Sequence, residues 1–358
     1  MSEIQRQPVS GPGVWSGEDF ETDLSYSYQL TDAHLAELDQ ALHGVKSQGL
    51  SLPEISAAQF PLASLSDLLS LMATDLRAGR GFALLHGLPV RDYDYEDLER
   101  LYWGLCSHIG MGRTQNSDAS FIHYVTTGER RPNQGGRGVG FPRKSPLHVD
   151  LNDIVSLLCV RQAPDDPPSW LASSLTLYNE ILKRRPAGLD RLFEGFEWDR
   201  MGEHDAVEAA TSGYLVPVFS QADGQMSCRY NRHWMQAAAA RNDTPFGKEN
   251  VALLDMVDEI AQDIKFEFEF HEGDMQFCSN YTVLHGRAAH ASEIQDDRRR
   301  LLFRIWLDVP DFRAFSDEAV VRYGIGQHGQ LGWTPAQMLS GANQQPRARR
   351  QDGAIMLA

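Results

Sequence analysis

The residues best suited to chemistry are a histidine and an aspartate two positions apart, His148 and Asp150. They stand just before the apolar segment 154–160. In an extended backbone, residues at this spacing point to the same side, and a cation between them would offset the cost of burying both. Taken alone, the triplet also fits a hydrogen-bonded pair at the surface.

A second histidine, His285, follows the apolar strand end 281–284, more than a third of the chain away from His148. Only the fold can bring it near the first pair. Two imidazoles and one carboxylate on one side of a metal leave three coordination positions open, the facial triad of non-haem Fe(II) oxygenases. Zinc is the competing metal, although its catalytic sites usually keep a single open position.

A strand expected at 300–308 carries two arginines that would face the same side. Alternation along the strand puts Arg300, Arg304 and Trp306 on one face. Arginines that face inward on an apolar strand are costly unless they meet anions, and their planar fork suits carboxylates. Either arginine could instead reach solvent or pair with an acidic side chain.

These residues must be positioned by the surrounding helices and strands. Helices are expected early in the chain, and strands in the part that carries the residues above. The spacing of apolar and capping residues predicts helices after Thr31, from Ser64 or Ser66 to Gly79, and at 95–109, 175–184 (capped by Ser173 or Ser174) and 248–264. Strands are predicted at 82–86, 147–160, 266–270, 275–285 and 300–308. A single α+β domain with a mainly antiparallel β core is the simplest arrangement.

The chain divides along its length by composition. We expect a flexible N-terminal arm at 1–20, one domain at 21–335 with a lid-like loop at 128–146 and a helical insert at 175–265, and a polar tail at 336–358. The glycines of the loop do not form a dinucleotide-binding motif, because Pro142 and Pro146 prevent the helix that must follow.

Composition excludes several classes of protein. The 358 residues carry 33 Lys+Arg against 49 Asp+Glu, a net charge of −16 that argues against nucleic-acid and anionic-membrane partners. The four cysteines are far apart, which fits free thiols in a reducing compartment. We find neither a signal-peptide pattern nor an apolar run long enough for a membrane span, and therefore expect a cytoplasmic protein. The sequence is compatible with a homo-oligomer.

Taken together, the motifs resemble the taurine dioxygenase and clavaminate synthase-like family. The resemblance rests on His148-x-Asp150, Asn280-x4-His285-Gly-Arg287 and Arg300-x3-Arg304-x-Trp306. It also covers 81–88 and 173–186, and it spans most of 20–310. It implies a double-stranded β-helix, or jelly-roll, core with flanking and inserted helices, and an Fe(II)- and 2-oxoglutarate-dependent oxygenase that uses O2.

The resemblance assigns roles residue by residue. His148, Asp150 and His285 would bind iron, and Arg300 would hold the far carboxylate of 2-oxoglutarate. Ser169 stands where the family often has a Ser or Thr that assists, although Pro167-Pro168 precede it here in place of the usual glycines. The candidate substrate contacts are Arg304, Asn280, Arg287, His290 and Tyr124.

The reaction expected from this resemblance is oxidation of a C–H bond, most simply hydroxylation, with release of succinate and CO2. Desaturation, cyclisation and bond cleavage stay open. The substrate would be a small molecule that carries a carboxylate, sulfonate or phosphonate, or an amino-acid derivative. Two alternatives remain. One is a zinc- or manganese-dependent hydrolase that uses the same three side chains, and the other is a metal-free binding protein on the same barrel.

Overall fold

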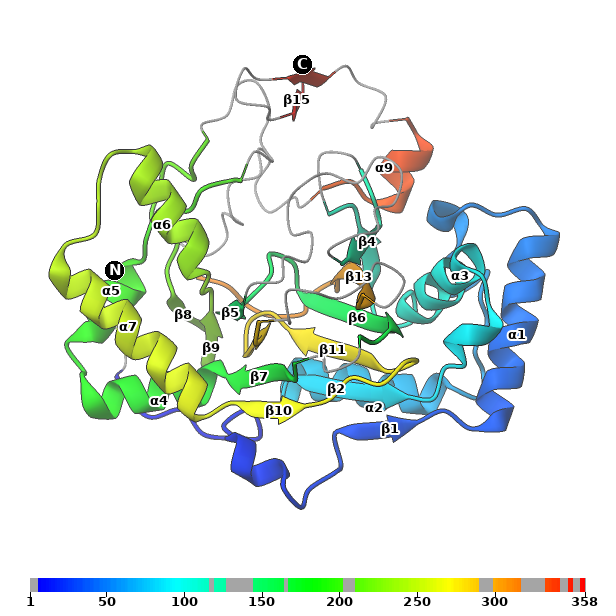
Figure 1. Cartoon of the computed structure of the whole chain (residues 1–358), viewed down its shortest axis with the longest axis horizontal. Coiled ribbons are helices and arrows are strands. Elements are labelled where there is room, and N and C mark those ends of the chain that lie inside the picture. The colour runs from blue at the N-terminus through cyan, green and yellow to red at the C-terminus, as the bar shows by residue number, and fades with distance from the viewer. Residues whose placement is uncertain are drawn as a thin grey trace.

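Two β-sheets form the centre of the molecule (Figure 1). The computed structural model describes residues 6–115, 119–126, 144–163, 167–201, 210–289, 299–316, 332–341, 347–349 and 355–357. Within these residues, the larger sheet contains, in spatial order, β1 (Ser27–Gln29), β2 (Phe82–His86), β11 (Met275–Ser279), β6 (Ile154–Arg161), β13 (Leu301–Asp308) and β3 (Met111–Arg113), and β4 (Ile122–Val125) also pairs with β13. The smaller sheet contains β10 (Phe266–Phe268), β7 (Ser169–Ser173), β12 (Val283–Arg287) and β5 (Ser145–His148). Strand pairing is antiparallel in both sheets apart from the parallel pair β1–β2.

Helices flank the sheets on two sides (Figure 1). One group is α1 (Asp32–Ser47), α2 (Ser66–Ala78) and α3 (Tyr95–Cys106). The other group is α4 (Ser174–Arg184), α5 (Gly188–Glu194), α6 (Arg232–Arg241) and α7 (Lys248–Asp263), with the hairpin β8 (Phe219–Ala222) and β9 (Gln225–Cys228). Short 3-10 helices lie at Gly17–Phe20, Leu52–Glu54 and Val90–Asp92, and α9 (Pro335–Leu339), β14 (Arg347–Arg349) and β15 (Ile355–Leu357) come last.

Alternation along the strands of the larger sheet divides the apolar core into two main clusters. Phe82 and Leu84 of β2 join the cluster that extends to α4 and α7, whereas Ala83 and Leu85 join the cluster under α1, α2 and α3. Both faces of this sheet are therefore buried. That explains why β2 is a continuous apolar run in the sequence and not an alternating one.

Most of the predicted helix boundaries are confirmed, and capping side chains set two of the helix starts. The Thr31 hydroxyl accepts a hydrogen bond from the amide of His34 at the start of α1, and the Ser173 hydroxyl caps α4 through the amide of Thr176. Gly79 ends α2 as predicted, whereas α3 ends at Cys106, before the expected 109.

The strand predicted at 147–160 is wrong in its middle. β5 ends at His148 and β6 begins at Ile154, and the two strands belong to different sheets. The connection 149–153 crosses from one sheet to the other, with the amide of Val149 bonded to the carbonyl of Tyr230. The crossing is buried although Asp150, Asn152 and Asp153 are polar, and this interruption of the apolar pattern is the sign of the break in the sequence.

The N-terminal arm is not loose in its described part, residues 6–20. Ser173 and Thr176 donate hydrogen bonds to the carbonyls of Gly13 and Trp15, and the indole of Trp15 donates to the carbonyl of Arg80. Most of the lid-like loop, and parts of the polar tail, lie outside the described residues. Among the helices that are described, none is long and apolar enough to cross a membrane.

If the arm is part of the fold, Trp15→Ala should lower the free energy of unfolding by about 3 kcal/mol or more, the usual cost of truncating a buried aromatic residue. Trp15 is only 5% exposed and packs edge-on against Phe20 and Phe82. Urea denaturation followed by circular dichroism measures the change. Leu24→Ala, at a side chain 64% exposed, is the control and should change little. Equal stability of the two variants would contradict a packed arm.

Candidate metal centre

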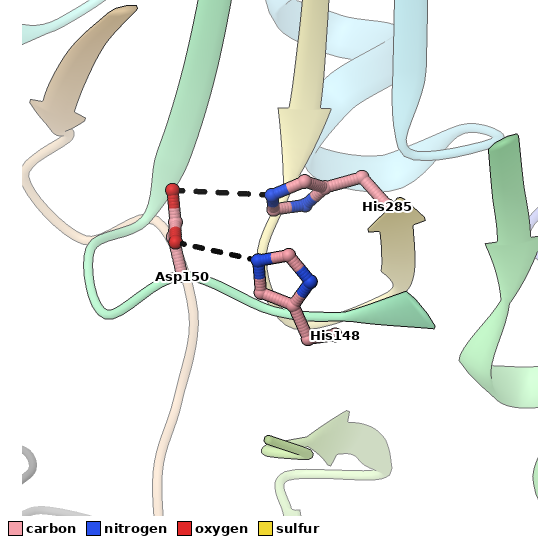
Figure 2. A group of neighbouring side chains, drawn as sticks. All are labelled: His148, Asp150 and His285. Atoms are coloured by element: carbon pink, nitrogen blue, oxygen red, sulfur yellow. Dashed lines mark ion pairs between the residues drawn. The ribbon is translucent and has the colours of Figure 1, made fainter. Parts of the chain in front are cut away.

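Three side chains converge where the two sheets meet (Figure 2). His148 lies at the end of β5, His285 lies on β12, and the two are register partners across this strand pair. Asp150 lies on the connection that follows β5. One ligand atom from each residue lies within 4.8 Å of the other two. The fold thus brings together the residues that the sequence separates.

The two imidazoles present the same ring nitrogen to the carboxylate. Nε2 of His148 lies 3.9 Å from Oδ1 of Asp150, and Nε2 of His285 lies 3.9 Å from Oδ2. Nδ1 of His148 lies 2.7 Å from the carbonyl of Pro146, which can only accept, so Nδ1 carries the proton and Nε2 is free to bind a metal. Burial, together with His148 and Arg304, outweighs the opposite effect of Asp150 and lowers the pKa of His285 to about 3, so this imidazole is neutral near pH 7.

Asp150 is ionised although it is only 5% exposed. Burial alone would raise the pKa of its carboxyl. The guanidinium of Arg304, the imidazoles of His285 and His148, and the indole N–H of Trp306 outweigh that effect and hold the pKa well below its ordinary value. The carboxylate is therefore ready to bind a cation at any ordinary pH.

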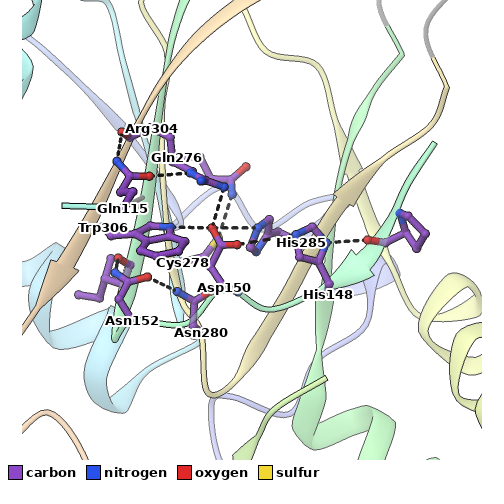
Figure 3. Close-up of polar contacts among 12 residues, drawn as sticks. Gln115, His148, Asp150, Asn152, Gln276, Cys278, Asn280, His285, Arg304 and Trp306 are labelled. Atoms are coloured by element: carbon purple, nitrogen blue, oxygen red, sulfur yellow. Dashed lines mark hydrogen bonds and ion pairs between the residues drawn. The ribbon is translucent and has the colours of Figure 1, made fainter. Parts of the chain in front are cut away.

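Buried amides fix the loop that carries Asp150 (Figure 3), and an arginine of the insert supports it as well. The amide N–H of Asp150 donates to Oδ1 of Asn280 at 3.0 Å, and the side chain of Asn280 donates to Oδ1 of Asn152 at 3.0 Å. Asn152 in turn donates to the carbonyl of Leu307. From the insert, Arg229 donates to the carbonyl of Asp150 at 2.7 Å, while its guanidinium stacks over a buried tyrosine ring.

Sequence reasoning missed the contribution of Asn152 and Arg229 to the site. Arg229 stands in a segment with two arginines, Arg229-Tyr230-Asn231-Arg232, inside the helical insert. That clustering is the signal that could have pointed to it. Asn152 gave none, because an asparagine in a polar stretch is typical of an ordinary turn.

The second predicted site also assembles. Arg300, directly before β13, donates from Nη2 to the hydroxyl of Ser169 at 3.1 Å. Both residues are buried, and the guanidinium lies 5.6 Å from the ring centre of Phe270. Pro167-Pro168 therefore do not displace Ser169 from the arginine that it was predicted to assist.

The predicted substrate contacts differ in their surroundings. Arg304 bonds to Asp150 and to Gln115. Arg287 is half-buried and donates to the carbonyl of Ala288. Asn280 is fully buried, with both amide atoms engaged by the Asp150 loop, so its position lends no support to a substrate contact.

Tyr124, a predicted substrate contact, lies on the face of the sheet opposite the candidate metal centre. It is the register partner of Phe303 on β13 and stacks on that ring at 4.5 Å, within the cluster under α3. Its hydroxyl donates to Glu99. The neighbouring His123 is the register partner of Arg304 and shares the face of the metal centre. The sequence alone does not show which alternate residues of β4 face inward. His290 lies outside the described residues.

Known proteins are similar to this chain in sequence or in fold. The model of the "Taurine catabolism dioxygenase TauD, TfdA family" matches residues 48–306. FR-33289 synthase of Streptomyces rubellomurinus is 28% identical over 322 residues, 88% of this chain and 94% of that protein. Taurine hydroxylase-like protein SAT17 of Stachybotrys chartarum is 29% identical over 310 residues, 82% of this chain and 78% of that protein.

Two solved structures are similar in fold. An asparagine oxygenase in complex with Fe(II), a 3-hydroxyasparagine and succinate superposes with a TM-score of 0.60 at 13% identity, covering 79% of this chain and 93% of that one. The non-haem iron oxygenase OrfP, in complex with Fe and alpha-ketoglutaric acid, has a TM-score of 0.55 at 16% identity, covering 79% and 94%.

The fold, the His148–Asp150–His285 cluster and the family match together define the class, a non-haem iron dioxygenase that depends on 2-oxoglutarate. The chain belongs to the TauD, TfdA family of these enzymes. The predicted jelly-roll fold class and the predicted enzyme class are therefore confirmed.

A first prediction at this centre concerns metal affinity. Asp150→Ala should abolish stoichiometric binding of Fe(II), because the buried imidazoles would lose the only anionic donor of the cluster. Anaerobic calorimetric titration measures the binding. Asp190→Ala, at a side chain 60% exposed, removes a carboxylate elsewhere and should bind iron as the unaltered protein does. Undiminished affinity of Asp150→Ala would remove this residue from the site.

Proposed function

We propose that His148, Asp150 and His285 hold one Fe(II) ion and that the enzyme hydroxylates a C–H bond of a small metabolite. The observation that carries this proposal is the convergence of three donor atoms, two imidazole nitrogens and one carboxylate oxygen, within 4.8 Å. Such a mixed nitrogen and oxygen set suits Fe(II) and leaves coordination positions for other ligands. Bound iron supplies, with 2-oxoglutarate and O2, the oxidising power for breaking the C–H bond while succinate and CO2 are released.

Arg300 and Ser169 would bind the far carboxylate of 2-oxoglutarate. They are already within hydrogen-bond distance of each other, and the apolar cluster of Cys159, Phe270 and Leu302 adjoins them. A guanidinium in apolar surroundings binds a carboxylate strongly because water competes little. Arg300 and Ser169 would thus orient the cosubstrate, and the adjoining apolar residues would exclude water.

The proposed substrate is an amino-acid derivative or another small molecule with a carboxylate, sulfonate or phosphonate. The similar solved structures were obtained with hydroxylated asparagine and hydroxylated arginine. In this chain, Arg287 is the register partner of Ser169, and His123 is the register partner of Arg304. Arg287, His123 and the predicted contact His290 are the side chains we assign to recognition of the polar groups.

Other features support a metabolic enzyme in one catalytic domain, which we place at 21–335. The four cysteines are buried and form no disulfide, which suits a reducing compartment such as the cytoplasm. The net charge of −16 disfavours nucleic acid and anionic membranes as partners. A zinc- or manganese-dependent hydrolase would have no use for the Arg300–Ser169 pair, and family membership also favours the oxygenase.

Turnover tests the reaction class. With added Fe(II) and ascorbate, the protein should convert 2-oxoglutarate to succinate under air and not under nitrogen, and the rate should rise with the true substrate. Succinate release is measured across a panel of amino acids, sulfonates and phosphonates. Hydrolytic activity that proceeds equally without oxygen would contradict the proposal.

Arg300→Ala tests the cosubstrate site separately. The concentration of 2-oxoglutarate needed for half-maximal rate should rise about 30-fold, because a charge-assisted hydrogen bond contributes about 2 kcal/mol. Iron binding should stay nearly intact. Arg91→Ala, at a side chain 83% exposed, is the matched control. An unchanged 2-oxoglutarate requirement in Arg300→Ala would place the carboxylate elsewhere.

A further inference from the structure

The two oxygens of Asp150 are not equivalent. Oδ2 accepts a hydrogen bond from the indole Nε1 of Trp306 at 2.8 Å and a second from Nη1 of Arg304 at 3.3 Å (Figure 3). Among the described residues, none donates a hydrogen bond to Oδ1. Each oxygen lies 3.9 Å from one imidazole Nε2, Oδ1 from that of His148 and Oδ2 from that of His285, so the hydrogen bonds are what make the two oxygens differ.

This asymmetry has a consequence for metal binding. Two N–H donors on one oxygen fix the rotation of the carboxyl group and draw negative charge toward that oxygen, which makes it the weaker metal ligand. A carboxylate that bound through both oxygens would fill one of the three open positions of a facial triad. 2-Oxoglutarate, which chelates through two atoms, and O2 need all three.

Arg304 is itself held on several sides. Gln115 accepts a hydrogen bond from Nε of Arg304 at 2.8 Å and donates from its own amide to the backbone carbonyl of Arg304 at 2.7 Å. The same amide of Gln115 donates to the carbonyl of Phe121. The guanidinium also lies 5.0 Å from the ring centre of Trp306. Gln115 and Trp306 are both buried, so these contacts are shielded from water.

We propose that Trp306, Arg304 and Gln115 form a carboxylate-positioning set that makes Asp150 a one-oxygen ligand and keeps a coordination position open for 2-oxoglutarate and O2. Arg304 then acts on the metal centre through Asp150 and does not serve as the anion-binding arginine of the substrate. This inference rests on the proposed function, because it presupposes iron at the three ligands.

An arginine that binds the substrate's anionic group would need to face that group. Here the guanidinium faces a carboxylate of the protein, and movement toward a second anion would break the bond to Asp150 or to Gln115. The net charge of the Arg304–Asp150 pair is also near zero, which weakens its attraction for an anion. Recognition of the substrate falls to other side chains.

The test needs no primary substrate. Under nitrogen, Fe(II) and 2-oxoglutarate chelated together give a visible charge-transfer absorption band that neither gives alone. Trp306→Phe keeps most of the ring and removes the N–H donor. We expect it to bind Fe(II) like the unaltered protein, to show a weakened or shifted band, and to need about tenfold more 2-oxoglutarate for half-saturation of the band.

Trp103→Phe is the matched control. Trp103 is 2% exposed, compared with 3% for Trp306, and its indole donates to a backbone carbonyl, that of Ile55, in the cluster under α3. The absorption band of Trp103→Phe, and the 2-oxoglutarate concentration that half-saturates it, should equal those of the unaltered protein. If Trp306→Phe also equals the unaltered protein, the inference is overturned. If the unaltered protein itself shows no band, the proposed function fails first, and the two failures are thus distinguishable.

A second variant, Arg304→Lys, tests the inference if Trp306→Phe folds poorly. Lysine keeps the charge but cannot bond both Asp150 and Gln115 in the same geometry. The positioning role predicts the same altered band and raised 2-oxoglutarate requirement in the absence of substrate. A substrate-binding role predicts an unaltered substrate-free band and a loss that appears only when the primary substrate is titrated, and that result would overturn the inference.

Discussion

The buried charge of Asp150 is the constraint on which the rest of the site depends. An ionised carboxylate cannot be buried without partners, because the loss of hydration costs far more than packing returns. Its partners come from both sheets: His148 and His285 from the smaller sheet, and Arg304 and Trp306 from β13 of the larger one. The site is therefore complete only when the two sheets are closed against each other.

The crossing 149–153 is the structural means by which one side chain can face both sheets. If β5 continued as a strand, Asp150 would stay in the sheet of His148. Strand pairing would then set the neighbours of Asp150, and its carboxylate would not face the larger sheet. The crossing is stabilised by paired amides, Asn280 with Asn152, and by Arg229 from the insert. The insert, which includes α5, α6 and β9, thus contributes directly to the position of a proposed metal ligand.

Much of this could be predicted from residue types and spacing. The imidazole and carboxylate motifs identified the cluster, Ser173 and Thr31 marked helix starts, and Arg300 was matched with Ser169. The break after His148 was missed because Val149 and Leu151 continue the alternation of a strand, although Asn152 and Asp153 interrupt the apolar pattern. The sequence also could not show that Arg304 bonds to Asp150, or on which face of β4 Tyr124 lies, since strand alternation gives two faces and only the packed fold says which partners each one meets.

The most direct test of the account is anomalous diffraction at the iron edge from crystals grown without oxygen in the presence of Fe(II) and 2-oxoglutarate. The account predicts one iron peak bonded to Nε2 of His148, Nε2 of His285 and a single oxygen of Asp150, Oδ1, with Oδ2 still bonded to Trp306 and Arg304. An iron peak away from these residues, or one chelated by both oxygens of Asp150, would contradict it.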